Sequence, residues 1–439
     1  MTHSETKPTV KGPPGNWRSW LIWSIAAIFY LYEYFVRVAP SVMIEELEVD
    51  FQITAATFGA GMAAYYYIYA PMQIVVGVLL DRFGGRLLMT GAAAIVALGC
   101  LMPLTSDTFA TLVTGRVLMG FGSAFAFVGT MFLATVWFPK NHLALLAGLT
   151  TALGMLGAII GEAPLSDLVE YLGWRESFAV AGVFGLFITA LIFFVVPMPP
   201  RWEEIRRRAY YKDDSEHTFV SGLKAVLVNT QTWIIGFIAF ALFMPLSVFG
   251  DLWGVGYIQA VTGAKKQVAA GAVSMLYLGW LIGGPVWGMV SDALGRRRMP
   301  LLISLFFTAL TTILLLLFPH IPMLWVYVLL LCMGLASSVQ VVCFVANLEA
   351  NPFFARGSSL AVTNMIVMLL GGVFQWVVGL ILNFMGRPDL DEGVRVLYTS
   401  TDYRVAMSVL PLMAIIGLFI AFFMRETYTE HHSDAPIGH

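Results

Sequence analysis

The chain has 439 residues with a formal net charge of −2, and 59% of its residues are apolar while 12% are charged. Soluble globular chains carry about 45–50% apolar and roughly 25% charged residues, so this composition excludes a protein whose whole surface faces water. Nucleic acid is excluded as a partner, because phosphate binding needs a basic face. The cysteines, Cys100, Cys332 and Cys343, lie in apolar runs and give neither a metal-binding spacing nor a disulfide framework.

Apolar runs of membrane-spanning length recur along the chain. A spanning helix needs about 20 largely apolar residues, and twelve runs meet this requirement. The polar start, Met1–Trp17, is not typical of a signal peptide, so insertion is expected to depend on the first run. The predicted spans lie near 20–43, 55–80, 87–105, 109–136, 143–164, 175–198, 230–258, 267–290, 300–318, 322–348, 358–384 and 403–424.

Basic residues are unevenly distributed between the predicted loops. If both termini are cytoplasmic, seventeen Lys and Arg lie on that side and six on the other, where the charged residues of the first loop, 45–50, are all acidic. Cytoplasmic loops of membrane proteins carry an excess of Lys and Arg. The sequence therefore predicts cytoplasmic termini in a plasma membrane, the inner membrane of a bacterium.

A charged turn between two apolar runs occurs twice, 211 residues apart. In each copy an Asp follows the first Gly by four residues, a second Gly follows three later, and basic residues close the turn. Ala293 stands in the second copy where the first has Arg82. This repetition predicts two related bundles. The residues of the repeated turn are Gly77, Asp81, Arg82, Gly84 and Arg86, then Gly288, Asp292, Gly295, Arg296 and Arg297.

The repeated turn resembles the signature loop of the major facilitator superfamily. Arg116–Gly122 resembles the family's Arg-x-x-x-Gly-x-Gly pattern in span 4, and the glycines of span 5 resemble its Gly-rich fifth helix. The resemblance implies that the turns act as gates: they hold the cytoplasmic ends together when the site faces outward. It also implies that spans 1, 4, 7 and 10 line a central cavity.

The predicted fold is an all-α membrane protein with twelve transmembrane helices in two pseudo-symmetric six-helix bundles. The longest connection, from Pro199 to about Asn229, carries Arg206-Arg207-Arg208 and is interpreted as an amphipathic linker. The predicted parts are an N-terminal tail (1–19), an N-terminal bundle (20–198), a linker (199–229), a C-terminal bundle (230–424) and a C-terminal tail (425–439).

Two arginines lie inside predicted spans. Arg37 is one turn from Glu33 in span 1, and Arg116 lies at a similar depth in span 4. Ionised residues inside spans usually face an interior cavity. Two arginines with one carboxylate leave a positive surplus that a substrate carboxylate or phosphate would complete. The alternative is a structural pair, Glu33 with Arg37 or with Arg116, that contacts no substrate.

Span 1 presents a polar face that includes Tyr30, Tyr34 and Ser41. Its segment Tyr34-Phe35-Val36-Arg37 resembles the first helix of organophosphate–phosphate antiporters, but those proteins have a second arginine on span 7, and 243–253 has none here. The resemblance therefore does not imply that the substrate is a phosphate ester. The predicted substrate-binding residues are Tyr30, Glu33, Tyr34, Arg37, Tyr66, Gln73, Arg116, Gln340 and Asn364.

Carboxylates are the candidates for proton coupling, because all seven histidines fall in loops or tails. Glu33 and Asp251 are the predicted proton-coupling residues, and Pro245 beside Asp251 predicts a helix break. Glu162 and Glu349 lie nearer span ends and are interpreted as structural or gating residues. Tyr69, Asn347 and Gln375 are expected to form interhelical hydrogen bonds.

The predicted function is secondary active transport of a small anionic organic solute by alternating access, with proton-coupled uptake. The alternatives are a proton-driven exporter of metabolites, siderophores or drugs, which the Gly-rich span 5 favours, and a transport-like solute sensor. The sequence has no Ser-His-Asp arrangement and no phosphate-binding Gly loop followed by Lys, so an enzyme is not expected. No cofactor or metal is predicted, and the expected partners are the substrate, the lipid bilayer and protons, with a monomeric chain.

Overall fold

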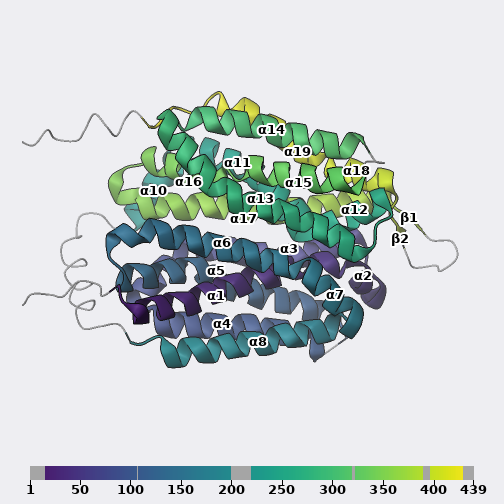
Figure 1. Cartoon of the computed structure of the whole chain (residues 1–439), viewed down its shortest axis with the longest axis horizontal. Coiled ribbons are helices and arrows are strands. Elements are labelled where there is room, and N and C mark those ends of the chain that lie inside the picture. The colour runs from purple at the N-terminus through teal and green to yellow at the C-terminus, as the bar shows by residue number, and fades with distance from the viewer. Residues whose placement is uncertain (1–14, 106, 199–218, 319–321, 389–395, 429–439) are drawn as a thin grey trace, which may run out of the picture.

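The computed structural model describes residues 15–105, 107–198, 219–318, 322–388 and 396–428. Within these residues the chain forms two bundles of roughly parallel helices, with the N-terminal half (α1–α8) below and the C-terminal half (α10–α19) above in Figure 1. The predicted all-α class with two six-helix bundles is confirmed. Residues 1–14, 199–218 and 429–439, which hold most of the predicted tails and linker, lie outside the described residues.

Twelve segments of the described chain are long and apolar enough to cross a membrane, which confirms the predicted number of spans. An even number of crossings places the start of α1, the end of α19 and both repeated turns on one face, on the left in Figure 1. We call this the motif face and the other the opposite face. The spans are Trp17–Val42, Ala55–Phe83, Gly85–Leu104, Phe109–Trp137, Leu143–Leu172, Trp174–Val195, Thr230–Thr262, Lys266–Leu294, Arg298–Leu317, Met323–Glu349, Phe353–Met385 and Ser400–Ala421.

Most spans contain one or two helices, and a few short elements join them. The α-helices are α1 (Trp17–Val38), α2 (Ile44–Phe51), α3 (Ala55–Phe83), α4 (Gly85–Leu101), α5 (Phe109–Trp137), α6 (Leu143–Gly161), α7 (Ala163–Leu172), α8 (Trp174–Val195), α10 (Phe219–Val228), α11 (Thr230–Met244), α12 (Gly254–Thr262), α13 (Lys266–Leu294), α14 (Arg298–Leu317), α15 (Met323–Ser337), α16 (Gln340–Glu349), α17 (Arg356–Met385), α18 (Ser400–Met407) and α19 (Val409–Ala421). The short elements are η1 (Ala39–Val42), η2 (Met102–Leu104), η3 (Lys140–His142), η4 (Pro245–Trp253), η5 (Phe353–Ala355), β1 (Arg387–Pro388) and β2 (Val396–Leu397), and the two strands pair antiparallel.

Two spans depart from a straight helix where the sequence contains Gly or Pro. Span 5 is interrupted at Glu162, between α6 and α7, and Pro164 lies in the first turn of α7, where a missing N–H costs little. Span 5 therefore extends to Leu172, beyond the predicted end at residue 164. In span 7 the break predicted near Pro245 is a π-helix, η4, which widens the helix without ending it.

Small residues let helices of the N-terminal half pack closely. A Cβ on Gly157 of α6 would meet the backbone carbonyl of Leu31 on α1, and a Cβ on Gly120 of α5 would meet that of Tyr65 on α3. Without a hydrophobic driving force between helices in lipid, such close approach supplies much of the packing energy. The Gly-rich spans 4 and 5 thus hold α1 and α3 in place.

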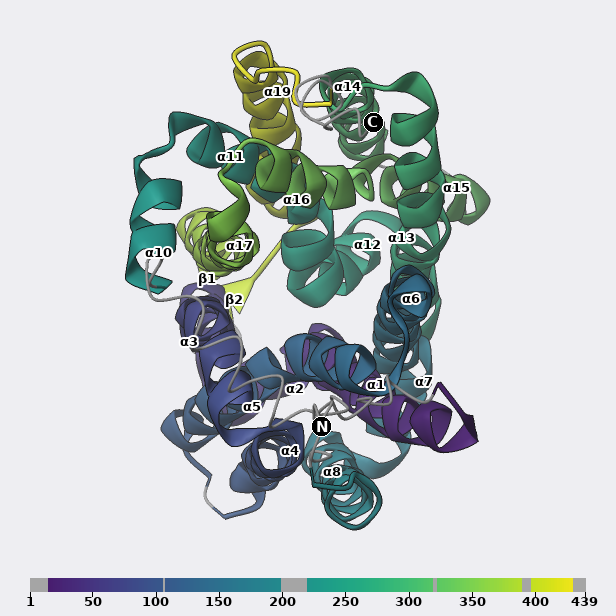
Figure 2. The ribbon, with the colours of Figure 1, turned by 90° about the vertical axis from the view of Figure 1, so that its left-hand side faces the viewer.

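The two halves meet along three sets of elements. α3 packs along α17, α6 and α7 pack against α13, and η1 packs against η4. In Figure 2, which looks at the motif face, α3 and α17 adjoin on one side and α6 and α13 on the other. η4, which carries Asp251, belongs to this contact, and α1, which carries Glu33 and Arg37, borders it.

Candidate functional site

Glu33 and Arg37 form a buried ion pair on α1. Arg37 Nε donates to Glu33 Oε1 over 3.0 Å, and Arg37 Nη2 and the hydroxyl of Tyr65 donate to the same oxygen. All three side chains are buried. Among the described residues, Arg37 Nη1 and Glu33 Oε2 have no hydrogen-bond partner. The pair predicted as an alternative is present, and each partner keeps one polar atom unsatisfied.

Tyrosine rings surround the Arg37 guanidinium. Its central carbon lies 4.2 Å from the ring centroid of Tyr34, 5.2 Å from that of Tyr69, 5.6 Å from that of Tyr65 and 5.9 Å from that of Tyr66. Aromatic rings within about 6 Å attract a cation through their negative faces. Sequence reasoning missed Tyr65, because no pattern distinguishes it from its neighbours Tyr66 and Tyr67 in the same run.

Arg116 donates hydrogen bonds to two backbone carbonyls of α1. Its Nη1 donates to the Val36 carbonyl over 2.9 Å, and its Nη2 donates to the Arg37 carbonyl over 3.2 Å. These carbonyls lie near the C-terminal end of α1, where helical partners run out and a cation is favourable. Among the described residues Arg116 forms no ion pair with Glu33, so the structural pair that joined these two residues is wrong.

Asp251 joins the two halves inside the membrane. The Tyr66 hydroxyl of α3 donates to its Oδ2, and the Tyr277 hydroxyl of α13 donates to its Oδ1 over 2.9 Å. The charges of Arg37 and Arg116 both act on this carboxylate. Asp251 is therefore part of the arginine cluster, although it lies in the other half of the chain.

Glu162 is a further buried carboxyl at the same junction. Ser41 of η1 donates to its Oε1 over 3.0 Å, and Asp251 acts on it electrostatically. With Glu33, the cluster then holds three carboxyls and two arginines. The surplus of positive charge expected from the sequence is absent. Packing of the helices brings Asp251 and Glu162, which are distant from Arg37 in the sequence, into the cluster.

The other predicted site residues lie around this cluster or away from it. Tyr30 stacks edge-on against Tyr34, with ring centroids 5.2 Å apart. Gln73 donates to the Ala124 carbonyl over 3.5 Å, which is an interhelical role. Gln340 is buried at the start of α16 and Asn364 is half-buried on α17; none of the described contacts joins either to Arg37.

Two predicted interhelical hydrogen bonds are present in the C-terminal half. Gln375 Nε2 donates to the Ser247 carbonyl over 2.7 Å, and Asn347 donates to the hydroxyl of Thr363. Tyr69, also predicted to form such a bond, stacks on Tyr65 with ring centroids 5.8 Å apart and lies beside the Arg37 guanidinium of α1.

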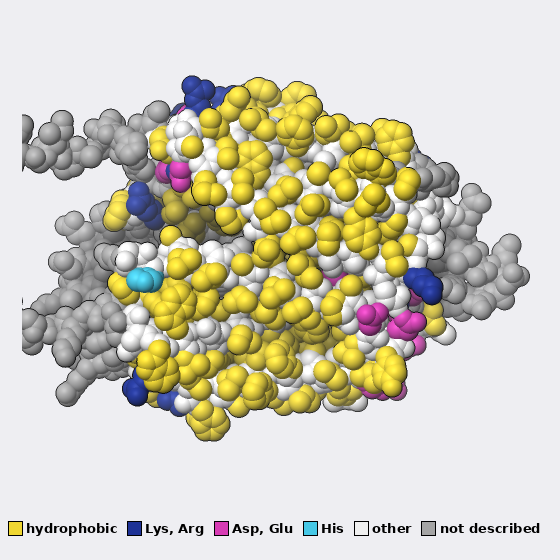
Figure 3. Space-filling view, viewed as in Figure 1, with side chains coloured by type: hydrophobic (Ala, Val, Ile, Leu, Met, Phe, Trp, Pro, Cys, Tyr) yellow, Lys and Arg dark blue, Asp and Glu magenta, His cyan; other side chains and the backbone are white. Residues whose placement is uncertain are grey.

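Hydrogen bonds and ion pairs between the halves gather toward the opposite face. Lys266 forms an ion pair with Glu46, Gln259 donates to Glu45 over 3.4 Å, and the Ala55 N–H donates to the Tyr398 hydroxyl over 3.0 Å. Burial raises the pKa of Tyr398 to about 12, so this hydroxyl stays neutral in ordinary buffers. Acidic side chains are visible at this end in Figure 3.

The space beside the glycines of the two halves differs between the two faces. A Cβ on Gly59, near the opposite face, would lie 2.9 Å from the Gln375 carbonyl of the other half, whereas a Cβ on Gly77 or Gly288 would meet no described atom within 4 Å. The surface in Figure 3 is indented between the halves at the motif face. The halves therefore approach closely near Gly59, and the two motif glycines have open space beside them.

The second repeated turn is held by a charged network. Arg297 donates to Asp292 over 2.7 Å and to Glu349 over 2.9 Å, and the Glu426 carboxylate accepts from the Arg297 N–H over 2.7 Å. Burial acts to lower the pKa of Arg297, but the hydrogen bonds that its guanidinium donates to Glu349 and Asp292 outweigh burial and raise the pKa. Glu349, interpreted from the sequence as a structural or gating residue, is thus paired with Arg297. The segment after α19 is held against this turn through Glu426.

The first turn is built differently. Gly84 adopts a φ of +81°, a conformation that favours glycine, between α3 and α4. The Arg86 guanidinium lies 4.8 Å from the ring centroid of Phe193, and that of Arg82 lies 5.4 Å from Phe83. The two copies of the motif therefore share a sequence pattern but fasten different segments.

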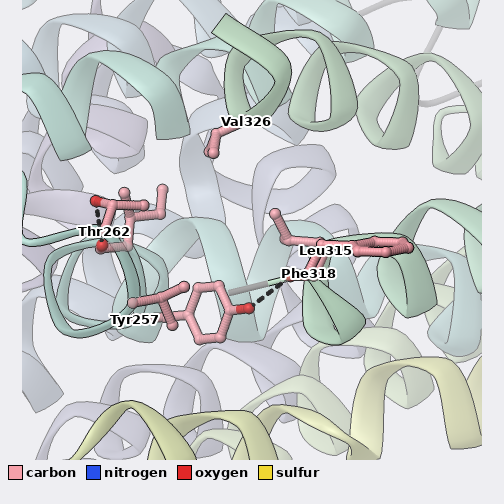
Figure 4. Close-up of a pocket in the computed structure, with 7 residues that line it drawn as sticks. Tyr257, Thr262, Leu315, Phe318 and Val326 are labelled. Atoms are coloured by element: carbon pink, nitrogen blue, oxygen red, sulfur yellow. Dashed lines mark hydrogen bonds between the residues drawn. The ribbon is translucent and has the colours of Figure 1, made fainter. Parts of the chain in front are cut away.

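A small pocket near the opposite face is not a candidate site. It is lined by Tyr257, Ile258, Val261, Thr262, Leu315, Phe318 and Val326. Figure 4 shows the Tyr257 hydroxyl directed at the Leu315 carbonyl, to which it donates over 2.8 Å. No charged side chain lines this pocket, so it offers nothing to hold an ionic substrate.

Twelve spans in two bundles, with buried charges where the halves meet, define an integral, multi-pass membrane protein of transporter architecture. The family model of the Major Facilitator Superfamily matches residues 22–375 and 252–439. The chain belongs to this superfamily, which confirms the resemblance seen in the repeated turns. Its relatives and its fold are those of transporters and not of enzymes.

Several relatives are named as transporters of anions. The chain is 24% identical over 283 residues to a probable sulfoacetate transporter of Cupriavidus necator, and 23% identical over 299 residues to a probable galactarate/D-glucarate transporter of Escherichia coli. Each alignment covers 63% of this chain and 66% of the relative. A probable nitrate/nitrite transporter of Mycobacterium tuberculosis is 24% identical over 89% of this chain and 90% of its own length.

Solved transporter structures share the fold. A bacterial homologue of the human lysosomal transporter Spinster, in an inward-facing and unoccupied conformation, superposes with a TM-score of 0.73 at 15% identity, covering 93% of this chain and 97% of its own. The nucleoside transporter NupG superposes with a TM-score of 0.73 at 12% identity, covering 93% and 99%.

Proposed function

We propose that the protein takes up a small organic anion by alternating access, driven by protons, with Arg37 as the anion-binding residue. The observation that carries the proposal is the Arg37 guanidinium, which is buried among tyrosine rings and keeps Nη1 without a partner. Guanidinium binds carboxylates and sulfonates through paired N–H groups. The anionic substrates in the names of the relatives support the same class.

We infer proton coupling from the numbers of charged groups in the cluster. Two arginines face three carboxyls, so an arriving anion would give the site a negative excess even when one of the carboxyls is protonated. An anion that binds Arg37 competes with Glu33, and a displaced Glu33 carboxylate would be left buried without its cation. Uptake of a proton with the anion relieves this excess, which favours symport.

The orientation rests on the basic residues. Arg82, Arg86 and Arg296–Arg298 all lie on the motif face, and an excess of Lys and Arg marks the cytoplasmic side. With the motif face in the cytoplasm of a bacterial cell, the contacts near Glu46 and Tyr398 close the outer side. The structure then corresponds to an inward-facing state.

The test is uptake by the purified protein reconstituted into liposomes. Labelled sulfoacetate and D-glucarate serve as probes, with and without an inside-alkaline pH gradient. We expect accumulation of one probe that depends on the gradient and is lost in Arg37→Ala. The matched control is Arg18→Ala, which changes an exposed arginine at the start of the same helix.

Other outcomes would assign the protein differently. Accumulation that Arg37→Ala leaves unchanged would remove the anion site from α1. Probe efflux driven by an inward proton gradient would make the protein an exporter, and probe binding without flux in either direction would make it a sensor.

A further inference from the structure

Glu162 lies well inside span 5, although the apolar run of the sequence ends beside it. α6 ends at Gly161, yet the span continues through α7 to Leu172. Ten residues at ~1.5 Å per residue place Glu162 about 15 Å from that end. This carboxyl is therefore a buried group within the length of the span and not one at its end.

The immediate surroundings of Glu162 offer little to an ionised carboxylate. The side chain is fully buried; Oε1 accepts a hydrogen bond from Ser41, and Oε2 has no hydrogen-bond partner in the part of the chain that the structure describes. Among the described ion pairs none includes Glu162. A buried carboxylate that lacks a cation costs several kcal/mol, whereas a neutral carboxylic acid can keep the Ser41 hydrogen bond.

The charged and titratable groups nearby are acids, hydroxyls or arginines engaged elsewhere. η4 contributes Asp251 and α13 contributes Tyr277, and both interact electrostatically with Glu162. On α1 and α5, which pack against α6, Arg37 binds Glu33 and Arg116 binds backbone carbonyls. The ionisable residues of α8 at this end are Arg175 and Glu176, in its first turn.

The location of Glu162 ties its environment to the closure of the opposite face. α7 packs against η1 of its own half and against α13 of the other half, and α6 also packs against α13. These contacts lie on the same side of the protein as the Glu46–Lys266 ion pair. Separation of the halves at that face would part α7 from α13 and admit water to Glu162.

We propose that Glu162 is a proton-binding site that must be occupied before the opposite face can close. In the open state the carboxylate takes a proton from water and becomes a carboxylic acid, and closure buries the neutral group. Asp251, which interacts with both Glu162 and Glu33, can accept that proton in turn. The inference rests on proton-coupled transport and adds a coupling residue on span 5 to Glu33 and Asp251.

A metal cation does not fit this position. Hard divalent cations take six or more oxygen ligands, whereas Glu162 and Ser41 together present three oxygens. The proposed ligand is therefore the proton.

Infrared difference spectroscopy of the full-length protein in lipid tests the site directly. Between acid and alkaline buffers we expect a carbonyl stretch of a buried carboxylic acid that appears on acidification. Glu162→Gln should abolish this band, and Glu33→Gln and Glu349→Gln should retain it. A band that persists in Glu162→Gln, or no such band in the wild type, would overturn the proposal.

Further measurements keep the test decisive if Glu162→Gln fails to fold. Ser41→Ala removes the described hydrogen bond to the carboxyl, so the band should move to higher wavenumber; an unmoved band would assign it to another acid. Sodium chloride replacing choline chloride at constant pH should leave the band unchanged. Loss of the band on adding sodium would mean a sodium site and would overturn the proposal.

Transport measurements on the reconstituted protein distinguish a failure of this inference from a failure of the proposed function. In Glu162→Gln, which mimics the neutral acid, we expect loss of gradient-driven accumulation of labelled sulfoacetate or D-glucarate, with exchange of internal for external probe retained. Accumulation equal to the wild type would overturn the closure requirement. If the wild type accumulates neither probe but shows the band, the proton site stands and the proposed function fails.

Discussion

The hydroxyl of Tyr66 donates a hydrogen bond to the Asp251 carboxylate, and this contact joins α3 of the first half to η4 of the second inside the membrane. The Glu46–Lys266 ion pair and the hydrogen bonds Gln259–Glu45 and Ala55–Tyr398, which also join the halves, lie nearer the opposite face. The Tyr66–Asp251 bond is thus the innermost of these four links, and in the proposed alternating access the bundles that it joins move relative to each other.

Removal of that link should favour opening of the opposite face. Tyr66→Phe deletes one hydroxyl, and a hydrogen bond to a charged group contributes about 1.5–3 kcal/mol, equivalent to about a ten- to hundredfold shift in an equilibrium. We expect faster amide hydrogen exchange in α2 than in the wild type. Tyr67→Phe, which changes a half-buried neighbour, is the control. Equal exchange in all three proteins would show that Tyr66 does not hold the halves together.

The ion pair between Glu46 and Lys266 should contribute less, because both side chains remain partly exposed. Such pairs are worth about 0.2–1 kcal/mol and weaken with salt. Glu46→Lys alone should change the rate of probe uptake, and the double variant with Lys266→Glu should restore it at low ionic strength. If the double variant behaves like the single one, the two residues do not act as a pair.

The two buried arginines should differ in what their loss changes. Arg116→Lys cannot span the two carbonyls that Arg116 bonds, and a buried carbonyl left unsatisfied costs about 1–3 kcal/mol. We expect a lower midpoint of thermal unfolding with measurable uptake retained. Arg37→Lys should keep its unfolding midpoint near that of the wild type and lose uptake, because the paired N–H groups are gone. The reverse pattern would exchange the roles assigned to the two residues.

Arg297 should control how firmly the segment after α19 is held. Arg297→Gln removes the bonds to Asp292 and Glu349 and the contact with the Tyr428 ring, whose centroid lies 4.8 Å from the guanidinium carbon. We expect faster tryptic cleavage after Arg425, followed by mass spectrometry. Arg296→Gln, at an exposed neighbour, also removes one tryptic site and should leave the rate unchanged. Equal rates in both variants would contradict the role of Arg297.

Much of the fold could be predicted from local patterns. Span length, the repeated turns and the helical spacing of Glu33 and Arg37 each depend on residues close together in the sequence, and the twelve spans and two bundles follow from them. The end of span 5 was misplaced because Pro164 interrupts the apolar run, whereas in the protein it begins a second helix. A proline in a first helical turn and one that ends a helix look alike in a sequence.

The candidate site was less predictable, because it forms where distant segments pack. The Tyr66–Asp251 bond joins residues 185 apart, and the Ser41–Glu162 bond joins residues 121 apart. No periodicity within one helix specifies which residue of another helix it meets. Arg116 illustrates the same limit, since its partners are backbone carbonyls, which every residue possesses and no sequence pattern marks.

The open space beside Gly77 and Gly288 has a consequence for engineering. A Cβ added at either position meets no described atom within 4 Å, and in the proposed alternating access the bundles tilt together at that end. Substitution by a bulky residue should therefore act as a wedge, tolerated in one conformer and rejected by the other. Such wedged variants would offer a route to trapping a single state for inhibitor screening.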